Sequence, residues 1–225
     1  MSMPRESEED ERSGVSRAER VYRLLREGIR TGAYRPGQRL REVQLAEELA
    51  TSRTPVREAI RRLEADRLVE SLPGRGYAVT QLDEARIREL YQFRAALEGA
   101  AAELAALQAT DLDIATLDAT LDAMRAASDD AARAAALNRR FHQAIYDAAR
   151  NVFLNQAIQA MSDVMALLPG TTYRKPGRVA QVVMEHEAVL GAIRRRDPVA
   201  ASTAMRAHIH AAGQFRVCMT LAGDG

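Results

Sequence analysis

The feature that most limits the fold of this 225-residue chain is a helical spacing of apolar residues that runs from Asp83 almost to the C-terminus. Apolar residues recur every three or four positions, as on one face of an α-helix, and no segment there alternates with the period of a strand. Antiparallel helices joined by short loops form a bundle that buries these stripes. The pattern predicts about six helices, at 83–108, 111–127, 130–150, 152–168, 178–195 and 197–221.

The first part of the chain has a different pattern, which predicts a winged helix-turn-helix. A helix begins at Ser16 and stops at Gly32, and YRPGQRL then reads as a turn because proline and glycine interrupt regular structure. Two more helices follow, at 42–50 and 53–67, and LVESLPGRGYAVT reads as a hairpin. The fold is therefore expected to be mainly α. The alternative for this segment is a small helical subdomain with a structural role.

These patterns predict three parts: a disordered tail at 1–14, a winged helix-turn-helix at 15–82 and a helical domain at 83–225. The tail is assigned because it is charged and has almost nothing to bury. The single cysteine, Cys218, excludes an internal disulfide framework and suits a reducing compartment. No secretory signal and no run of membrane-spanning length is present, so we expect a cytoplasmic protein without a membrane partner.

Charge is distributed unevenly along the chain. The net charge is only +1, so any affinity for nucleic acid must come from a local patch. Residues 14–82 contain 14 arginines against 9 acidic residues, whereas residues 83–225 contain 16 basic residues against 17 acidic ones. The basic excess therefore belongs to the predicted winged helix-turn-helix.

Three arginines in the predicted third helix, Arg53, Arg57 and Arg61, lie four residues apart on one side. Like charges at this spacing cost an isolated helix about 0.2–0.5 kcal/mol per pair, which suggests an outside partner. Arg53 and Arg57 have no acidic residue three or four positions away, whereas Arg61 has Glu58 and Glu64. We therefore expect the first two to be free of neighbouring carboxylates. The alternative is an ordinary solvated helix face.

The beginning of a recognition helix enters the major groove, where arginines and hydroxyl groups contact bases and phosphates. Ser52 and Thr54 supply hydroxyls beside the two arginines, and Arg75 at the hairpin tip is a natural contact for a wing. The alternative for Arg75 is a solvated turn residue. The predicted partner is double-stranded DNA.

The stretch SRTPVREAIRRL, followed by a glycine-rich hairpin, resembles the DNA-binding domain of GntR-family bacterial transcription regulators. The resemblance implies that Ser52, Arg53, Thr54 and Arg57 contact DNA, with Gly74 and Arg75 in the wing. Arg61 is a weaker candidate for DNA contact, since Glu58 and Glu64 are placed to neutralise it.

Three of the four histidines lie on apolar stripes of three different predicted helices: His142, His186 and His208. Asn138 is one turn before His142 on the same face, whereas His210 falls on a polar face and is excluded. Neutral imidazoles bind zinc, nickel, cobalt, copper or iron, and three of them leave positions open for another ligand. The alternative is that each histidine is a satisfied core residue.

The stretches FRAALEGAAAELAA, NRRFHQAIYDAARN and MEHEAVLGAIRRRDPVAASTAMRAHI resemble the FCD effector domain of the FadR branch of this family, in its short VanR-like type. The resemblance implies a divalent transition metal, zinc first and nickel or another as alternatives. It also implies a small organic acid bound beside the metal, for which Arg94 is the candidate, unless Arg94 pairs with Glu98. The implied metal ligands are Asn138, His142, His186 and His208, with asparagine where the family has aspartate.

These observations predict a metabolite-responsive DNA-binding regulator, a repressor by the commoner family behaviour, that binds a pseudo-palindromic operator as a homodimer. The alternative is a metal-dependent enzyme using the three histidines. No HExxH motif is present, and Glu185 and Glu187 are expected to point away from the stripe of His186, which leaves no general base. We therefore expect no enzyme activity. A helical scaffold that binds neither DNA nor metal is a third possibility.

Overall fold

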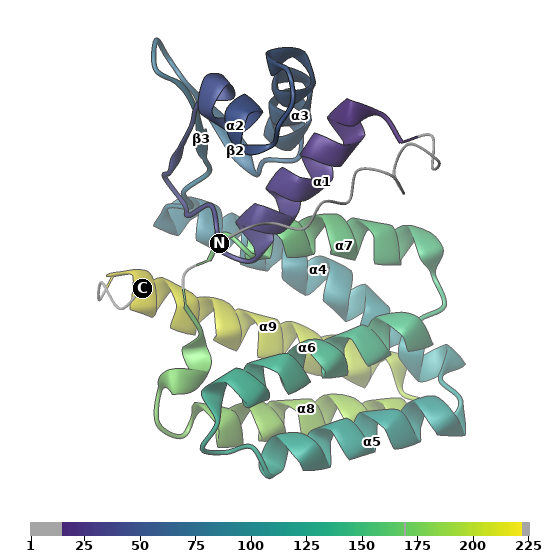
Figure 1. Cartoon of the computed structure of the whole chain (residues 1–225). Helices are drawn as coiled ribbons and strands as arrows, with labels where there is room; N and C mark the ends of the chain where they lie inside the picture. The colour runs from purple at the N-terminus through teal and green to yellow at the C-terminus, as the bar shows by residue number, and fades with distance from the viewer. Residues whose placement is uncertain (1–14, 169, 222–225) are drawn as a thin grey trace. The chain divides into compact units, whose positions relative to one another are not determined.

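The computed structural model describes residues 15–168 and 170–221, so the expected tail at 1–14 lies outside the described residues. The described chain forms two compact units. One contains the residues up to Leu82 together with Ser162–Leu168, and the other contains the rest. Each unit is helical with one exception, a small antiparallel sheet in the first unit (Figure 1).

The first unit is the predicted winged helix-turn-helix. It contains three helices and three strands. The strands form an antiparallel sheet in the spatial order β1-β3-β2, so that β3 is the central strand. The short strand β1 was not predicted, because the Pro-Gly turn beside it dominates the local pattern. The elements are α1 Arg17–Arg30, β1 Arg39–Leu40, α2 Glu42–Glu48, α3 Arg53–Ala65, β2 Val69–Leu72 and β3 Gly76–Val79.

Helices α1 and α3 form the core of this unit because each has one apolar face. The side chain of Ser16 caps α1 by accepting a hydrogen bond from the backbone N–H of Glu19. The predicted buried face of α3, Val56, Ile60 and Leu63, has no exposed surface at all. Burial of each such side chain contributes about 1.5–3 kcal/mol. This packing leaves the opposite face of α3 to solvent.

A segment from much later in the sequence completes this unit. Leu167 is 2% exposed and belongs to the same apolar core as Val21 and Leu25 of α1. Asp163 forms an ion pair with Arg26 of α1, with 2.6 Å between the guanidinium Nη2 and the carboxylate Oδ2. The sequence assigned Ser162–Leu168 to the helical domain, but the structure packs it with the DNA-binding unit.

The predicted helices after Asp83 are all present in the described residues, and their ends agree with the expected ends to within three residues (Figure 1). Helix α4 packs against α9, α6 and α8, and α5 packs against α6 and α8. A short 3-10 helix, η1, was not predicted. The elements are α4 Glu84–Gln108, α5 Asp111–Arg125, α6 Ala131–Ala148, α7 Val152–Met165, η1 Thr172–Arg174, α8 Arg178–Arg194 and α9 Pro198–Leu221.

Small residues allow α4 and α9 to approach each other closely. A Cβ atom on Gly99 of α4 would lie 2.7 Å from Nε of Arg206, and one on Gly213 of α9 would lie 3.0 Å from the Tyr91 side chain. Buried alanines of α4 continue the same contact surface. The close approach brings side chains of α4 and α9 to the same buried layer as those of α6 and α8.

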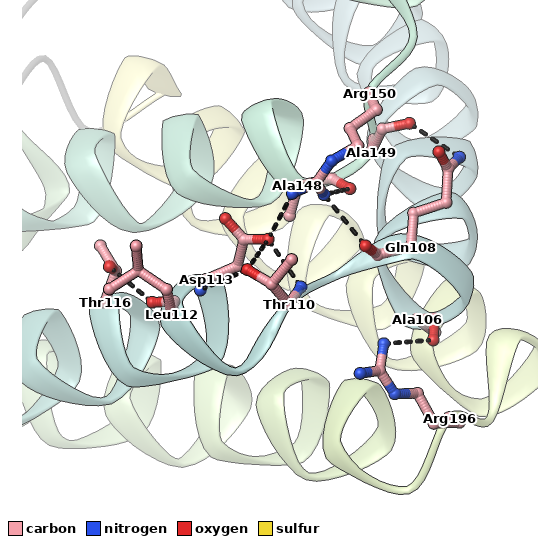
Figure 2. Close-up of polar contacts among 10 residues, drawn as sticks. All are labelled: Ala106, Gln108, Thr110, Leu112, Asp113, Thr116, Ala148, Ala149, Arg150 and Arg196. Atoms are coloured by element: carbon pink, nitrogen blue, oxygen red, sulfur yellow. Dashed lines mark hydrogen bonds and ion pairs between the residues drawn. The ribbon is translucent and has the colours of Figure 1, made fainter.

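Arg150 joins two turns at one end of the bundle (Figure 2). Its Nη1 donates to the backbone oxygens of Gln108 and Ala148 at 3.0 and 3.1 Å, and its Nη2 pairs with Asp113 at 2.9 Å. Asp113 also belongs to the capping box that begins α5 at Thr110. These contacts satisfy carbonyls at two helix ends and hold the α4–α5 and α6–α7 turns together.

Among the described residues, no helix combines the length and the apolar character needed to cross a membrane.

Candidate nucleic-acid interface and metal centre

The predicted DNA-contacting residues at the start of α3 are exposed. Ser52 occupies the N-cap position of α3, but its side chain makes no capping hydrogen bond, so its hydroxyl is available. Arg53 and Arg57 are 60% and 47% exposed at their side chains. Thr54 and Arg61 are exposed as well, and all lie away from the buried face of α3.

The expectation that Arg53 and Arg57 have no neighbouring carboxylate is wrong. Glu42 at the start of α2 accepts a hydrogen bond from Nη2 of Arg53 at 3.1 Å. It also accepts from Nε and Nη2 of Arg57, at 3.1 and 2.9 Å. The hydrogen bonds from Arg57 are the main cause that lowers the pKa of Glu42. One carboxylate between two guanidinium groups leaves a net positive charge and orients both arginines on the exposed face.

The positive charge of Arg61 was expected to be neutralised by Glu58 and Glu64, and the part of the chain that the structure describes does not show these ion pairs. Within the described residues it forms no ion pair, neither with Glu58 nor with Glu64. It is therefore a stronger candidate for a DNA contact than the sequence alone indicated.

Arg75 lies at the tip of the wing, as predicted. Strands β2 and β3 pair from Val69 with Val79 to Leu72 with Gly76, so residues 73–75 form the turn. Gly74 has φ of +69°, in the left-handed region that favours glycine. Arg75 follows it at the exposed tip of the hairpin.

The three predicted histidines come together in the second unit. His142 of α6, His186 of α8 and His208 of α9 are buried, and each offers one ring nitrogen within 4.8 Å of the others. His210 is exposed, in agreement with its exclusion.

Two of these histidines face each other through the same ring atom. Nε2 of His142 lies 3.2 Å from Nε2 of His208. Nδ1 of His142 lies 2.5 Å from Oε2 of Glu98, and Nδ1 of His208 lies 2.6 Å from Oε2 of Glu185. The expectation that Glu185 points away from the site is therefore wrong. Glu185 is one residue from His186 in α8, yet its side chain reaches across to α9.

His186 is held differently from the other two. Neither of its ring nitrogens has a hydrogen-bond partner, although the side chain is fully buried. Its ring stacks on Phe141, with the centroids 4.1 Å apart and the planes 9° from parallel. Burial lowers the pKa of His186 well below its usual value, so the ring is neutral at pH 7. A buried imidazole without partners is costly unless something else binds it.

The donor set fits a divalent transition metal. The carboxylates of Glu98 and Glu185 accept hydrogen bonds from the two Nδ1–H groups, which leaves lone pairs on both Nε2 atoms. Two lone pairs that face each other at 3.2 Å repel unless a proton or a metal lies between them. Imidazoles whose Nδ1–H groups donate to carboxylates are a common arrangement at zinc sites, and His142 and His208 have such partners. The buried Oδ1 of Asn138 also has no partner, although its role as a ligand stays a prediction.

Buried arginines lie behind both carboxylates. Arg94 of α4 pairs with Glu98 through its Nε, as the alternative reading of this residue anticipated. Nη1 of Arg178 donates to Oε1 of Glu185 at 3.1 Å. Burial alone would raise the pKa of Glu98, but Arg94 and His142 together lower it, and His208 and Arg178 do the same for Glu185.

Arg178 was not predicted from the sequence as a residue of this site. It is 2% exposed, and its guanidinium lies over the ring of Phe215, 4.5 Å from the centroid. Its position eight residues before His186 and four before Val182 places it on the same apolar stripe. That periodicity could have identified it.

Two family comparisons cover most of the described chain. Residues 17–79 match the gntR family of bacterial regulatory proteins, and residues 89–211 match the FCD domain. The chain belongs to the GntR family. The resemblance stated for both parts of the sequence is confirmed.

Relatives of this GntR protein are named as transcription regulators. The galactonate operon transcriptional repressor of Escherichia coli is 30% identical over 211 residues, covering 84% of this chain and 92% of that protein. The Glc operon transcriptional activator of Escherichia coli is 28% identical over 217 residues, covering 85% and 84%. The solved structure of Escherichia coli McbR/YncC has a TM-score of 0.66 at 25% identity and covers 87% of this chain and 94% of that one.

These comparisons confirm the predicted fold, a winged helix-turn-helix followed by a helical domain. They also decide between two of the readings of the sequence. The GntR protein is a transcription regulator rather than an enzyme.

Proposed function

We propose that this GntR-family regulator is a metabolite-responsive repressor that binds a pseudo-palindromic operator as a homodimer. We also propose that a small carboxylate, bound beside a metal ion in the helical unit, controls it. The second proposal rests on the Nε2 atoms of His142 and His208, which lie 3.2 Å apart. In a neutral ring with the proton on Nδ1, Nε2 has a lone pair that can bind a metal.

On the DNA side, Arg53 and Arg57 would contact guanine edges or phosphates in the major groove. Ser52 and Thr54 would donate to phosphates, with Arg61 further along α3. Arg75 would contact a phosphate or the minor groove, and Gly74 allows the turn that presents it. In a two-fold dimer the two recognition helices would read half-sites about one helical turn of DNA apart.

On the effector side, His142, His186 and His208 would bind the metal, with Asn138 as an additional oxygen ligand. Zinc is the first candidate, and nickel or another divalent transition metal is the alternative. The metal would act as a Lewis acid that binds one carboxylate oxygen of the effector. Arg94 pairs with Glu98 through its Nε, and its terminal NH2 groups would bind a second oxygen of the effector.

The effector would change DNA affinity only if it binds the two conformations of the dimer unequally. We propose repression relieved by effector because the more identical of the two named relatives is a repressor. Because it would bind operator DNA, we also propose that the protein is cytoplasmic.

A mobility-shift experiment tests the DNA part. Wild-type protein should shift DNA from upstream of its own gene, and the shift should weaken steeply between about 50 and 200 mM salt. Arg53→Ala and Arg57→Ala should each weaken operator binding by about 5- to 150-fold, the value of one arginine–guanine pair. Arg140→Ala, an exposed arginine of α6, is the matched control and should bind normally. Normal binding by both α3 variants would refute the assignment of the recognition helix.

Metal analysis and a ligand screen test the effector part. Purified wild-type protein should contain about one metal ion per chain at saturation, and His186→Ala should lose it while His210→Ala keeps it. A panel including acetate, lactate, malonate and succinate should contain an acid that raises the melting temperature and releases operator DNA. A protein without metal, or release that is unchanged in His186→Ala, would refute this part.

A further inference from the structure

One connected chain of polar contacts crosses the buried layer of the second unit. It runs from Arg94 through Glu98 to His142, across the 3.2 Å contact to His208, and then through Glu185 to Arg178. Four helices contribute to it. Each half has the same order, arginine, glutamate and histidine, although the two halves come from unrelated positions in the sequence.

The chemistry of each half fixes which nitrogen of the histidine carries the proton. A carboxylate that pairs with a guanidinium is ionised, and an ionised carboxylate can only accept hydrogen bonds. Nδ1 of His142 and Nδ1 of His208 must therefore donate, at 2.5 and 2.6 Å. In a neutral ring, a proton on Nδ1 leaves a lone pair on Nε2, and the two Nε2 atoms lie 3.2 Å apart.

We propose that Glu98 and Glu185 are positioning residues of the metal centre. They hold His142 and His208 in the tautomer and orientation that direct both Nε2 atoms at the metal, and Arg94 and Arg178 keep the two carboxylates ionised and in place. This inference rests on the metal site of the proposed function. It adds that Arg94, the proposed effector-binding residue, and His142, a proposed metal ligand, both contact the carboxylate of Glu98.

The third histidine provides an internal contrast. His186 has no carboxylate partner, and its orientation depends on stacking with Phe141. The metal centre thus has two ligands set by hydrogen bonds and one set by ring packing. Loss of a carboxylate should affect the site without changing the position of His186.

The test compares glutamates on the two sides of His186. Glu185→Gln keeps the size of the side chain but removes the charge that holds Nδ1–H of His208. Glu187→Gln is the matched control, because Glu187 lies two residues away on α8 and pairs with Arg125. Zinc affinity, measured by competition with a chromophoric chelator, should fall about 10- to 100-fold in Glu185→Gln, the usual effect of losing an outer carboxylate partner. It should be unchanged in Glu187→Gln.

Glu98→Gln should lower zinc affinity to a similar degree. Glu98 is fully buried, so the melting temperature in EDTA should be measured first to confirm that the variant folds. The side chain of Glu185 is 17% exposed, so Glu185→Gln is expected to disturb folding less. That variant alone decides the test if Glu98→Gln does not fold.

A second readout does not depend on metal. In the metal-free wild-type protein, nitrogen-15 chemical shifts should show His142 and His208 protonated at Nδ1, and Glu185→Gln should shift His208 towards the Nε2–H form. Wild-type zinc affinity in Glu185→Gln, or Nε2–H forms of both histidines in the wild-type protein, would overturn the inference. If the wild-type protein bound no zinc, the metal part of the proposed function would fail and the inference with it, whereas wild-type zinc affinity in Glu185→Gln would overturn the inference alone.

Discussion

At the scale of single residues, the contacts of Glu42 change the interpretation of the arginine face. Spacing along α3 showed no acid near Arg53 or Arg57, but spacing within one helix cannot reveal a side chain from another. Glu42 binds both guanidinium groups without burying them. Phosphates or guanine edges would then have to replace this carboxylate, so we expect Glu42 to compete with DNA for the two arginines and to weaken contacts with the wrong sequences.

We expect Glu42→Gln to raise affinity for non-operator DNA several-fold at low salt, because a neutral amide no longer competes with phosphates. The preference for operator over scrambled DNA should decrease. Titrations of both DNA sequences at several salt concentrations measure this. Glu58→Gln, an exposed acid of α3 for which the described residues show no arginine partner, should change neither value. A loss of operator binding as large as that of Arg57→Ala would show instead that Glu42 is needed to orient the arginines.

At the scale of elements, α7 is the helix whose packing differs most from what its sequence predicted. The helix itself was predicted, because its apolar residues have helical spacing. Its C-terminal end and the residues after it, Ser162–Leu168, pack with α1 of the DNA-binding unit through Leu167 and Asp163. A segment of the effector half of the sequence is thus a structural part of the DNA-binding unit.

Leu167→Ala should therefore destabilise the DNA-binding unit by about 2–5 kcal/mol, the usual cost of removing a buried leucine side chain. Hydrogen exchange of the backbone amides of α1 and α3 should become faster, and operator affinity should fall with it. Phe153→Ala, at a position of α7 that is 80% exposed, is the control and should leave exchange unchanged. Unaltered exchange in α1 and α3 of Leu167→Ala would contradict this packing.

At the scale of the whole molecule, the pKa values of His186 and His208 depend on their burial by the bundle. Burial lowers the pKa of His208 to about 4, against the opposite effect of Glu185, and it also lowers the pKa of His186 well below its usual value. The usual value is 6.5. In the metal-free protein the unfolded state therefore binds more protons below pH 6.5, so folding stability is complete above that pH and decreases as the pH falls towards 4.

Chemical unfolding of the metal-free protein should show this loss. Between pH 7.5 and pH 5.0 the free energy of unfolding should fall by about 2 kcal/mol from His208 alone, with a further loss from His186. With zinc bound the decrease should be steeper, since protons and metal compete for the same nitrogens. His208→Gln should remove part of the slope, and His210→Ala should not. A stability that stays constant over this range in EDTA would contradict the buried neutral histidines.

Local patterns were enough to predict the helices, the wing and the three histidines, because each depends on periodicity, turn residues or a short motif. Val56, Ile60 and Leu63 could be assigned to the core of α3 from spacing alone, and His210 could be excluded in the same way. These properties belong to one element at a time, so no knowledge of its neighbours was needed.

Contacts between side chains of different elements could not be predicted in this way and became visible in the folded chain. Glu42 on the arginines, Glu185 on His208, Arg178 behind Glu185 and Leu167 in the core of the first unit all join residues from different elements. Helical spacing gives the direction of a side chain around its own axis, but a long flexible side chain such as glutamate can reach a neighbouring helix from the edge of a stripe. Which helix that is depends on packing, and packing depends on the whole chain.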